Sequence, residues 1–141
     1  MLVRLMYASR AVESAGEAEL TQILQQSKRN NPGVGVTGVL CLSAGIYLQV
    51  LEGGRNAVSA LYNKIAADPR HKDVVILRYE EIDERSFGSW SMGQANLSRL
   101  NPAVVIKYSE TAELDPYSVS GRVSMALFHE LVASAAVLGK G

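Results

Sequence analysis

The sequence has one cysteine, no long apolar run and no excess of charge of either sign. A lone Cys41 excludes an internal disulfide and a thiolate metal cluster. No apolar run reaches the roughly 18 residues that a membrane-spanning helix needs, and the first residues lack the pattern of a signal peptide. The formal net charge is +0, whereas nucleic-acid-binding domains carry a basic patch. We therefore expect a cytoplasmic protein that binds neither membranes nor nucleic acid.

Motifs of the common catalytic and metal sites are also missing. There is no glycine-rich phosphate loop, and no serine lies in a nucleophile-elbow sequence. The two histidines, His71 and His129, are far apart, and no His-x-x-x-His or Cys-x-x-Cys spacing occurs, so nothing favours a zinc-type site. We expect a protein that is not an enzyme and holds no metal.

What the sequence does have is apolar residues in short, ordered runs. They make up 48% of 141 residues, which is enough for one compact core. Asn30–Gly33 is expected to end the first helix, because proline cannot continue a helix and glycine opens a turn. The pattern predicts strands over residues 2–8, 36–42, 46–52, 74–82 and 90–97, helices over 16–29 and around 58–65, and two further helices after 101–102 and 115–116.

This order of elements predicts an α+β fold, a ferredoxin-like βαββαββ sheet with two helices on one face. The other face would then be apolar and bare, so the C-terminal helices are expected to cover it. Their apolar stripe of Val119, Val123, Leu127 and Leu131 would otherwise serve as a seam between copies in a homo-oligomer. We divide the chain into a domain over residues 1–98 and a helical extension over 99–141.

A polar side chain stands inside an apolar run at Gln49. A buried amide without partners costs roughly 1–3 kcal/mol, so Gln49 needs either a local partner or a ligand. In the predicted topology the first and third strands are neighbours, which would bring Gln49 beside Tyr7, with Asn31 at a helix end on the same side. Carboxamides carry both donors and acceptors, which suits the edge of a flavin ring.

These residues, in this order, resemble those of the BLUF family of blue-light sensors that use FAD. The resemblance covers roughly residues 2–97. It rests on Tyr7–Ser9, Asn30–Asn31, Thr37–Gly38 with Leu40, Gln49–Gly53, Asp68–His71 and Ser89–Met92.

The resemblance implies a bound FAD, with FMN or riboflavin as alternatives, lying between the two helices. Lys64 stands where the family often has arginine, and lysine keeps the charge but loses the bidentate fork. Tyr7 and Gln49 would be photoactive, Trp90, Met92 and Ser9 would relay the signal, and the flavin would contact Asn30, Asn31, Gln49, Lys64, Asp68, Arg70 and His71.

The resemblance also implies a mechanism. After excitation, Tyr7 would give an electron and a proton through Gln49, which would end rotated or tautomerised with new hydrogen bonds to the flavin. The last strand, with Trp90 and Met92, and the C-terminal helices would then pass the signal to an unidentified partner protein or through a homo-oligomer.

Two other functions remain open on the residues alone. An acylphosphatase-type enzyme of the same fold could use Arg4, Arg10 and Asn31 around a phosphate, although Ser9–Val12 lacks the glycines of an anion cradle. A ligand-free dimerisation module is the other. Bound flavin in the purified protein would separate the photoreceptor from both.

Overall fold

The computed structural model describes residues 1–12, 16–95, 102–113, 115–133 and 137–138. Strands and helices follow the predicted order, which confirms the α+β class. The elements are β1 (Leu2–Ala11), α1 (Gly16–Val34), β2 (Thr37–Ser43), β3 (Ile46–Gly54), α2 (Arg55–Ala67), β4 (His71–Ile82), β5 (Gly93–Ala95), α3 (Pro102–Tyr108), α4 (Gly121–Ala133) and β6 (Val137–Leu138).

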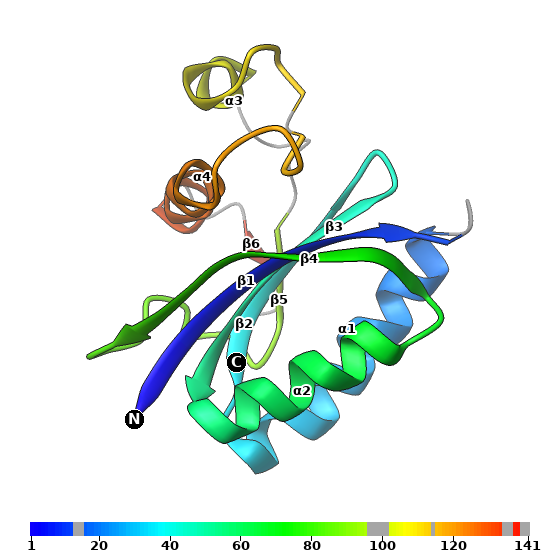
Figure 1. Cartoon of the computed structure of the whole chain (residues 1–141), viewed down its shortest axis with the longest axis vertical. Helices are drawn as coiled ribbons and strands as arrows, with labels where there is room; N and C mark the ends of the chain where they lie inside the picture. The colour runs from blue at the N-terminus through cyan, green and yellow to red at the C-terminus, as the bar shows by residue number, and fades with distance from the viewer. Residues whose placement is uncertain (13–15, 96–101, 114, 134–136, 139–141) are drawn as a thin grey trace.

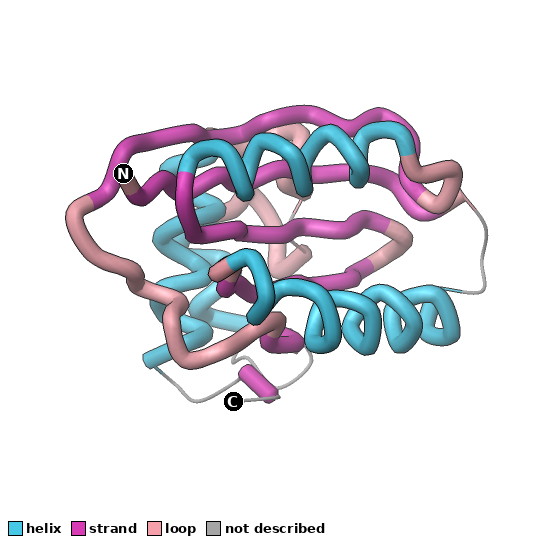
Figure 2. The backbone as a smooth tube through the Cα atoms, turned by 90° about the horizontal axis from the view of Figure 1, so that it is seen from below, coloured by secondary structure: helices cyan, strands magenta, loops and turns pink. Residues whose placement is uncertain are grey.

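The sheet has the strand order β4-β1-β3-β2-β5-β6. β1 is antiparallel to both β3 and β4, whereas β5 runs parallel to β2. Helices α1 and α2 lie on one face of the sheet, and α3 and α4 lie on the other (Figure 1). Seen from below, α1 and α2 lie in front of the sheet, and strands are visible between these two helices (Figure 2). The ferredoxin-like arrangement and the C-terminal cover of the second face are both confirmed.

Side-chain alternation along the central strands builds two separate cores. On β1, Leu5 and Tyr7 belong to the cluster beneath α1 and α2, whereas Met6 and Ala8 pack in a second cluster that includes residues of α3 and α4. Successive side chains of a strand point to opposite faces. Because both faces are covered, β1 is buried throughout from Val3 to Ser9.

The end of α1 corrects the sequence prediction. The helix does not stop at Asn30 but continues through Pro32 to Val34. Gly35 then takes a φ of 70°. The Val36 N–H donates to the Asn31 carbonyl and the Gly35 N–H to the Pro32 carbonyl, which is the Schellman pattern of helix termination. Asn31 is therefore held inside the last helical turn, and its side chain has a fixed direction.

The last predicted strand is also corrected. Strand β5 covers only Gly93–Ala95, so Trp90 and Met92 precede it; residues 96–97 lie outside the described part of the chain. Residues two apart in a strand share a face, yet Trp90 packs with the α3–α4 cluster and Met92 with the α1–α2 cluster. The backbone bends at residues 91–92, just before β5, and the two side chains lie on opposite sides of the sheet.

Candidate functional site

A cavity of about 320 Å³ lies beneath α1 and α2, over the central strands. Its size is at the lower end of the range of small-molecule sites, ~300–1,000 Å³. Apolar side chains of the two helices form much of its wall, and polar groups gather at its deep end and at its mouth. The lining residues include Tyr7, Ile23, Asn31, Gln49, Ala57, Leu61, Lys64, Asp68, Arg70 and His71.

Tyr7 and Gln49 meet at the deep end of this cavity. Strand pairing sets them directly opposite each other on β1 and β3, as predicted from the topology. The Tyr7 hydroxyl donates to Gln49 Oε1, and Gln49 Nε2 donates to Met92 Sδ over 3.2 Å. Both side chains are almost fully buried. Because a thioether is a weak acceptor, the donor end of this amide is held less firmly than its acceptor end.

The Tyr7 phenol is held in its protonated form. Burial, with Tyr47 and Tyr62 nearby, raises the pKa of Tyr7 far above its ordinary value, because a phenolate cannot be solvated there. The Tyr62 ring packs edge-on at 5.9 Å from the Tyr7 ring. If Tyr7 loses an electron, its proton becomes strongly acidic, and Gln49 Oε1 is the acceptor already in contact.

Asn31 connects the cavity to the segment that contains Met92. Its side chain is 2% exposed, and Nδ2 donates to the carbonyl of Ser91 over 2.8 Å. The Gly38 N–H of β2 likewise donates to the Trp90 carbonyl over 3.0 Å. Two consecutive carbonyls just before Met92, those of Trp90 and Ser91, are therefore bound by residues of β2 and α1.

Charged groups lie at the cavity mouth. Arg70 contacts the Asp68 carboxylate at 2.6 Å and Gln26 Oε1 at 3.1 Å. The hydrogen bond from Arg70 holds the pKa of Asp68 below its usual value. Lys64 and Asn30 also line the cavity and are exposed. Two cations beside an apolar cleft suit a phosphate-bearing ligand, with Arg70 the more oriented of the two.

His71, at the start of β4, and Ser9, two residues after Tyr7 on β1, form a buried pair. Ser9 Oγ lies 2.7 Å from His71 Nδ1, and the imidazole packs 4.9 Å from the Tyr47 ring. Burial lowers the pKa of His71, so the ring is neutral near pH 7. Ser9 therefore bonds to His71, and among the hydrogen bonds found in the described part of the chain none joins its side chain to Trp90 or Met92.

Trp90 and Met92, the two candidates for relaying the signal, lie on opposite faces of the sheet. Met92 touches Gln49 and is fully buried on the cavity side. Trp90 packs in the cluster formed with α3 and α4 and does not line the cavity. The sequence left open which of the two is nearer the flavin; neither residue lines the cavity, and Met92 contacts its wall through Gln49.

Two charged residues were missed by the sequence analysis as a pair. Arg4 and Glu52 lie opposite each other on β1 and β3, three residues from Tyr7 and Gln49 respectively, and on the other face of the sheet. Glu52 is completely buried. The sequence signal that could have revealed the pair was an acidic residue, Glu52, at the end of one apolar strand and a basic residue, Arg4, within another.

Within the described residues, no helix is both long and apolar enough to cross a membrane. The same part of the chain contains no group of three or more His, Cys, Asp or Glu side chains that could hold a metal ion.

The fold and the cavity define a small α+β domain with a candidate ligand site between two helices. Residues 2–93 match the family described as "BLUF: Sensors of blue-light using FAD". The chain belongs to this family, which confirms the resemblance seen in its residues.

Curated relatives share the same region. The chain is 36% identical over 95 residues to the photoactivated adenylate cyclase subunit beta of Euglena longa, and 40% identical over 88 residues to subunit alpha of Euglena gracilis. These alignments cover 67% and 62% of this chain but only 11% and 9% of the relatives. The chain thus matches a small part of much longer proteins.

Solved structures resemble the chain over nearly its whole length. The photo-activated state of BlsA superposes with a TM-score of 0.83 at 30% identity, covering 94% of this chain and 95% of that one. The dark state of the BLUF protein BlrB gives a TM-score of 0.79 at 30% identity, with 95% and 96% covered. The similarity therefore includes the C-terminal helices.

Proposed function

We propose that this chain is a blue-light photoreceptor that binds a flavin, with FAD as the expected form, and signals by rearranging hydrogen bonds around Gln49. The observation that carries the proposal is the Tyr7–Gln49 pair at the deep end of the cavity. One side chain is an oxidisable phenol, and the other is an amide with a donor end and an acceptor end.

The donor set of the cavity fits a flavin. Asn31 and Gln49 offer amide groups to the polar edge of a ring system, and the apolar side chains of Ile23 and Leu61 flank its faces. Lys64 and Arg70 at the mouth would hold the phosphates. Asp68 and His71 would act from the same end, Asp68 by orienting Arg70.

In the proposed photocycle, a bound flavin that has absorbed blue light would supply a one-electron oxidant. Tyr7 would lose an electron to it, and the Tyr7 hydroxyl proton would pass to Gln49 Oε1 while Gln49 Nε2 passes one proton on to the reduced flavin. When the electron and one proton return from the flavin to Tyr7, Gln49 would remain rotated or in the imidic tautomer and would present a different set of hydrogen bonds. No covalent bond between heavy atoms breaks.

We propose that Met92 is the first residue to respond, because a rearranged Gln49 no longer donates in the same way to its sulfur. This is a shift of population between two packings of the segment around Trp90 and Met92. The output would pass through this segment and α4 to a separate partner protein or to a second copy of the chain. Ser9 would act only indirectly, through His71. The cytoplasmic location stays a prediction.

The competing enzyme is not supported by the geometry. Arg4 is bound to Glu52 and Glu80 on the face away from the cavity. Arg10 lies over the Tyr117 ring and beside Asp73. The basic groups of an acylphosphatase-type cradle therefore do not converge.

The test is a pair of tyrosine variants. Tyr7→Phe should bind flavin and remain yellow but give no red-shifted absorption on blue illumination, because the transferable proton is gone. Tyr62→Phe removes a hydroxyl from the neighbouring ring and should retain the shift. A normal shift in Tyr7→Phe, or a wild-type protein that takes up no flavin, would contradict the proposal.

A further inference from the structure

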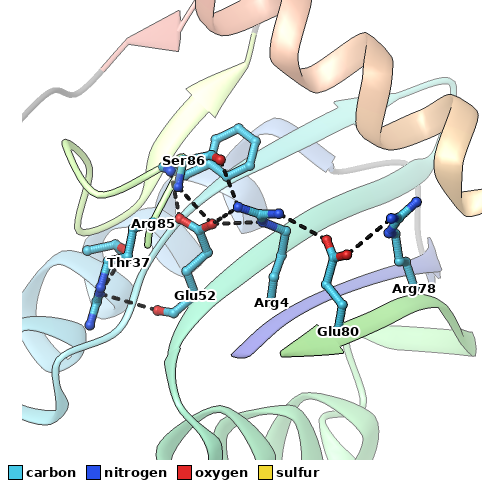
Figure 3. A network of polar contacts seen from close by, with 8 residues as sticks. Arg4, Thr37, Glu52, Arg78, Glu80, Arg85 and Ser86 are labelled. Carbon is cyan, nitrogen blue, oxygen red and sulfur yellow. Dashed lines mark hydrogen bonds and ion pairs between the residues drawn. The ribbon is translucent and has the colours of Figure 1, made fainter. Parts of the chain in front are cut away.

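On the face away from the cavity, Glu52 belongs to a network of polar contacts that also includes Arg4, Glu80 and Ser86 (Figure 3). It lies three residues beyond Gln49 on β3, and its side chain is fully buried. Oε2 accepts from Arg4 Nε over 2.8 Å and from the Ser86 N–H over 3.0 Å, and Oε1 accepts from the Phe87 N–H over 2.6 Å. A buried carboxylate is stable when both oxygens have such donors.

Arg4 completes this arrangement. It stands between Glu52 and Glu80 across three neighbouring strands. Its guanidinium donates to Glu80 Oε1 over 2.9 Å and to Ser86 Oγ over 2.7 Å, in addition to Glu52. Ser86 is thus bound twice, through its backbone by Glu52 and through its side chain by Arg4.

The residue before Ser86 is fixed independently. Arg85 donates to Thr37 Oγ1 over 2.9 Å and to the Gly35 carbonyl over 2.7 Å. Three consecutive residues, 85–87, are therefore held to β3, to β2 and to the end of α1. We call residues 85–92 the switch segment, because they end at Met92, the residue that contacts Gln49.

The switch segment also reaches α4. Phe87 is fully buried, and its ring lies 6.4 Å from Phe128 and 5.4 Å from His129. The same carboxylate that fixes the Phe87 backbone therefore sets how this ring packs against the helix. Position 87 is the point where β3, the switch segment and α4 meet.

From these contacts we infer that Glu52, held by Arg4, is a positioning residue of the light switch: it anchors residues 86–87 so that Trp90 and Met92 stay on opposite faces of the sheet. This inference rests on the proposed function. With the segment tied at residue 87, a change in the Gln49–Met92 contact must be absorbed by residues 88–91. That includes Trp90, which packs against the helices of the other face.

The anchor favours the dark arrangement. A displacement of residues 88–91 pulls on the hydrogen bonds that hold the backbone of Ser86 and Phe87 to Glu52, and these bonds draw the segment back. Removing them should slow the thermal return of the illuminated form. It should also let Trp90 move more freely in the dark, without altering the groups that contact the flavin.

The test uses Glu52→Gln. The amide keeps the shape but turns one acceptor into a donor, which then faces a backbone N–H. The chain has one tryptophan, so its fluorescence reports on Trp90 alone. We expect bound flavin and a normal red shift, stronger acrylamide quenching of Trp90 in the dark, and recovery about three- to tenfold slower, the factor expected from one net hydrogen bond.

Glu80→Gln is the matched control. Glu80 also binds Arg4, and its hydrogen bonds within the described residues go to Arg4 and Arg78 rather than to residues 86–87. Quenching and recovery should therefore stay at wild-type values even if stability falls. Unchanged quenching and recovery in Glu52→Gln would overturn the inference, as would equal changes in Glu80→Gln. Loss of the red shift in wild type would instead contradict the proposed function.

Glu52→Asp keeps the inference testable if Glu52→Gln does not fold. The shorter carboxylate retains its charge and its acceptors but reaches the backbone less well. We expect dark recovery to be slower than in the wild type and acrylamide quenching of Trp90 to be stronger, both by less than complete loss of the Glu52 bonds would cause. Wild-type values for both in a folded Glu52→Asp protein would show that the anchor does not govern the switch.

Discussion

The two faces of the β1–β3 pair carry opposite kinds of polar chemistry within three residues of each other. On the cavity face, Tyr7, Gln49 and Met92 form a neutral chain of hydrogen bonds. On the other face, Arg4 and Glu52 form a buried ion pair whose carboxylate also binds backbone N–H groups.

This difference decides which side chains can rearrange: the neutral Gln49 amide can rotate, whereas the buried Arg4–Glu52 pair has to keep its contacts. A neutral amide exchanges its donor and acceptor ends without moving charge in a medium of low polarity. A buried charge that loses a partner is strongly destabilised. Placing the two on opposite faces of one strand pair lets the cavity side rearrange while the other side keeps the strands and the switch segment in register.

The largest expected effect comes from breaking the charged face. Arg4→Met should leave the Glu52 carboxylate buried without its cation and lower the free energy of unfolding by about 3–5 kcal/mol. Urea unfolding of the wild type and the variant measures this. A loss below about 1 kcal/mol, typical of exposed ion pairs, would show that the two faces do not differ as described.

A substitution at Gly121, at the start of α4, should have a smaller effect on stability and tests how closely this helix packs on the face away from the cavity. A Cβ added at Gly121 would lie 2.1 Å from the carbonyl oxygen of Leu77 on β4. Gly121→Ala should therefore push the start of α4 away from the sheet and cost about 1–3 kcal/mol. Thermal unfolding gives the loss. Gly33→Ala, in α1 with nothing within 4 Å of the added atom, should be neutral or slightly stabilising and serves as the control.

The cavity face should respond to pH through His71. Burial lowers the pKa of His71 below its ordinary 6.5, with Asp68 opposing and Arg70 adding to the shift. The unfolded chain then binds more protons than the folded one below about pH 6.5. The stability contributed by neutral His71 is complete above that pH and is lost as the pH falls through 6.5 towards the folded value.

His71→Asn should flatten this dependence, as measured by urea unfolding at about pH 7.5 and 5.5. His129, on the other face, also has a pKa lowered mainly by burial, so part of the slope should remain. An identical slope in His71→Asn and the wild type would show that His71 is not buried as a neutral ring.

The smallest expected effect comes from an ion pair at the surface. Arg55 and Glu81 are 50% and 61% exposed, so water screens their attraction. Glu81→Gln should change stability by less than about 1 kcal/mol and leave flavin binding unaltered. A loss comparable to that of Arg4→Met would mean that burial does not explain the difference between the two pairs.

The periodicity of apolar residues along the sequence was sufficient to predict the order of strands and helices and most of the fold. Strand neighbours follow from the order of elements, and with them the meeting of Tyr7 and Gln49. The end of α1 could not be predicted from Pro32, because the termination depends on the left-handed conformation at Gly35 and on bonds back to the last turn.

The segment around Trp90 was mistaken for a strand because apolar side chains two apart imitate β alternation. Only tertiary contacts, the Gly38 and Asn31 hydrogen bonds and the Glu52 anchor, turn it so that Trp90 and Met92 diverge. The Arg4–Glu52 pair escaped notice for a related reason, since strand register determines which charges meet across a sheet.

A dark-state crystal structure of the flavin-bound protein would show where the ring lies relative to Gln49. We expect the flavin ring between α1 and α2, with its polar edge within hydrogen-bond distance of Gln49 and Asn31, and Tyr7 in contact with the far end of the Gln49 amide. A ring bound elsewhere, or one separated from Gln49 by intervening side chains, would contradict it.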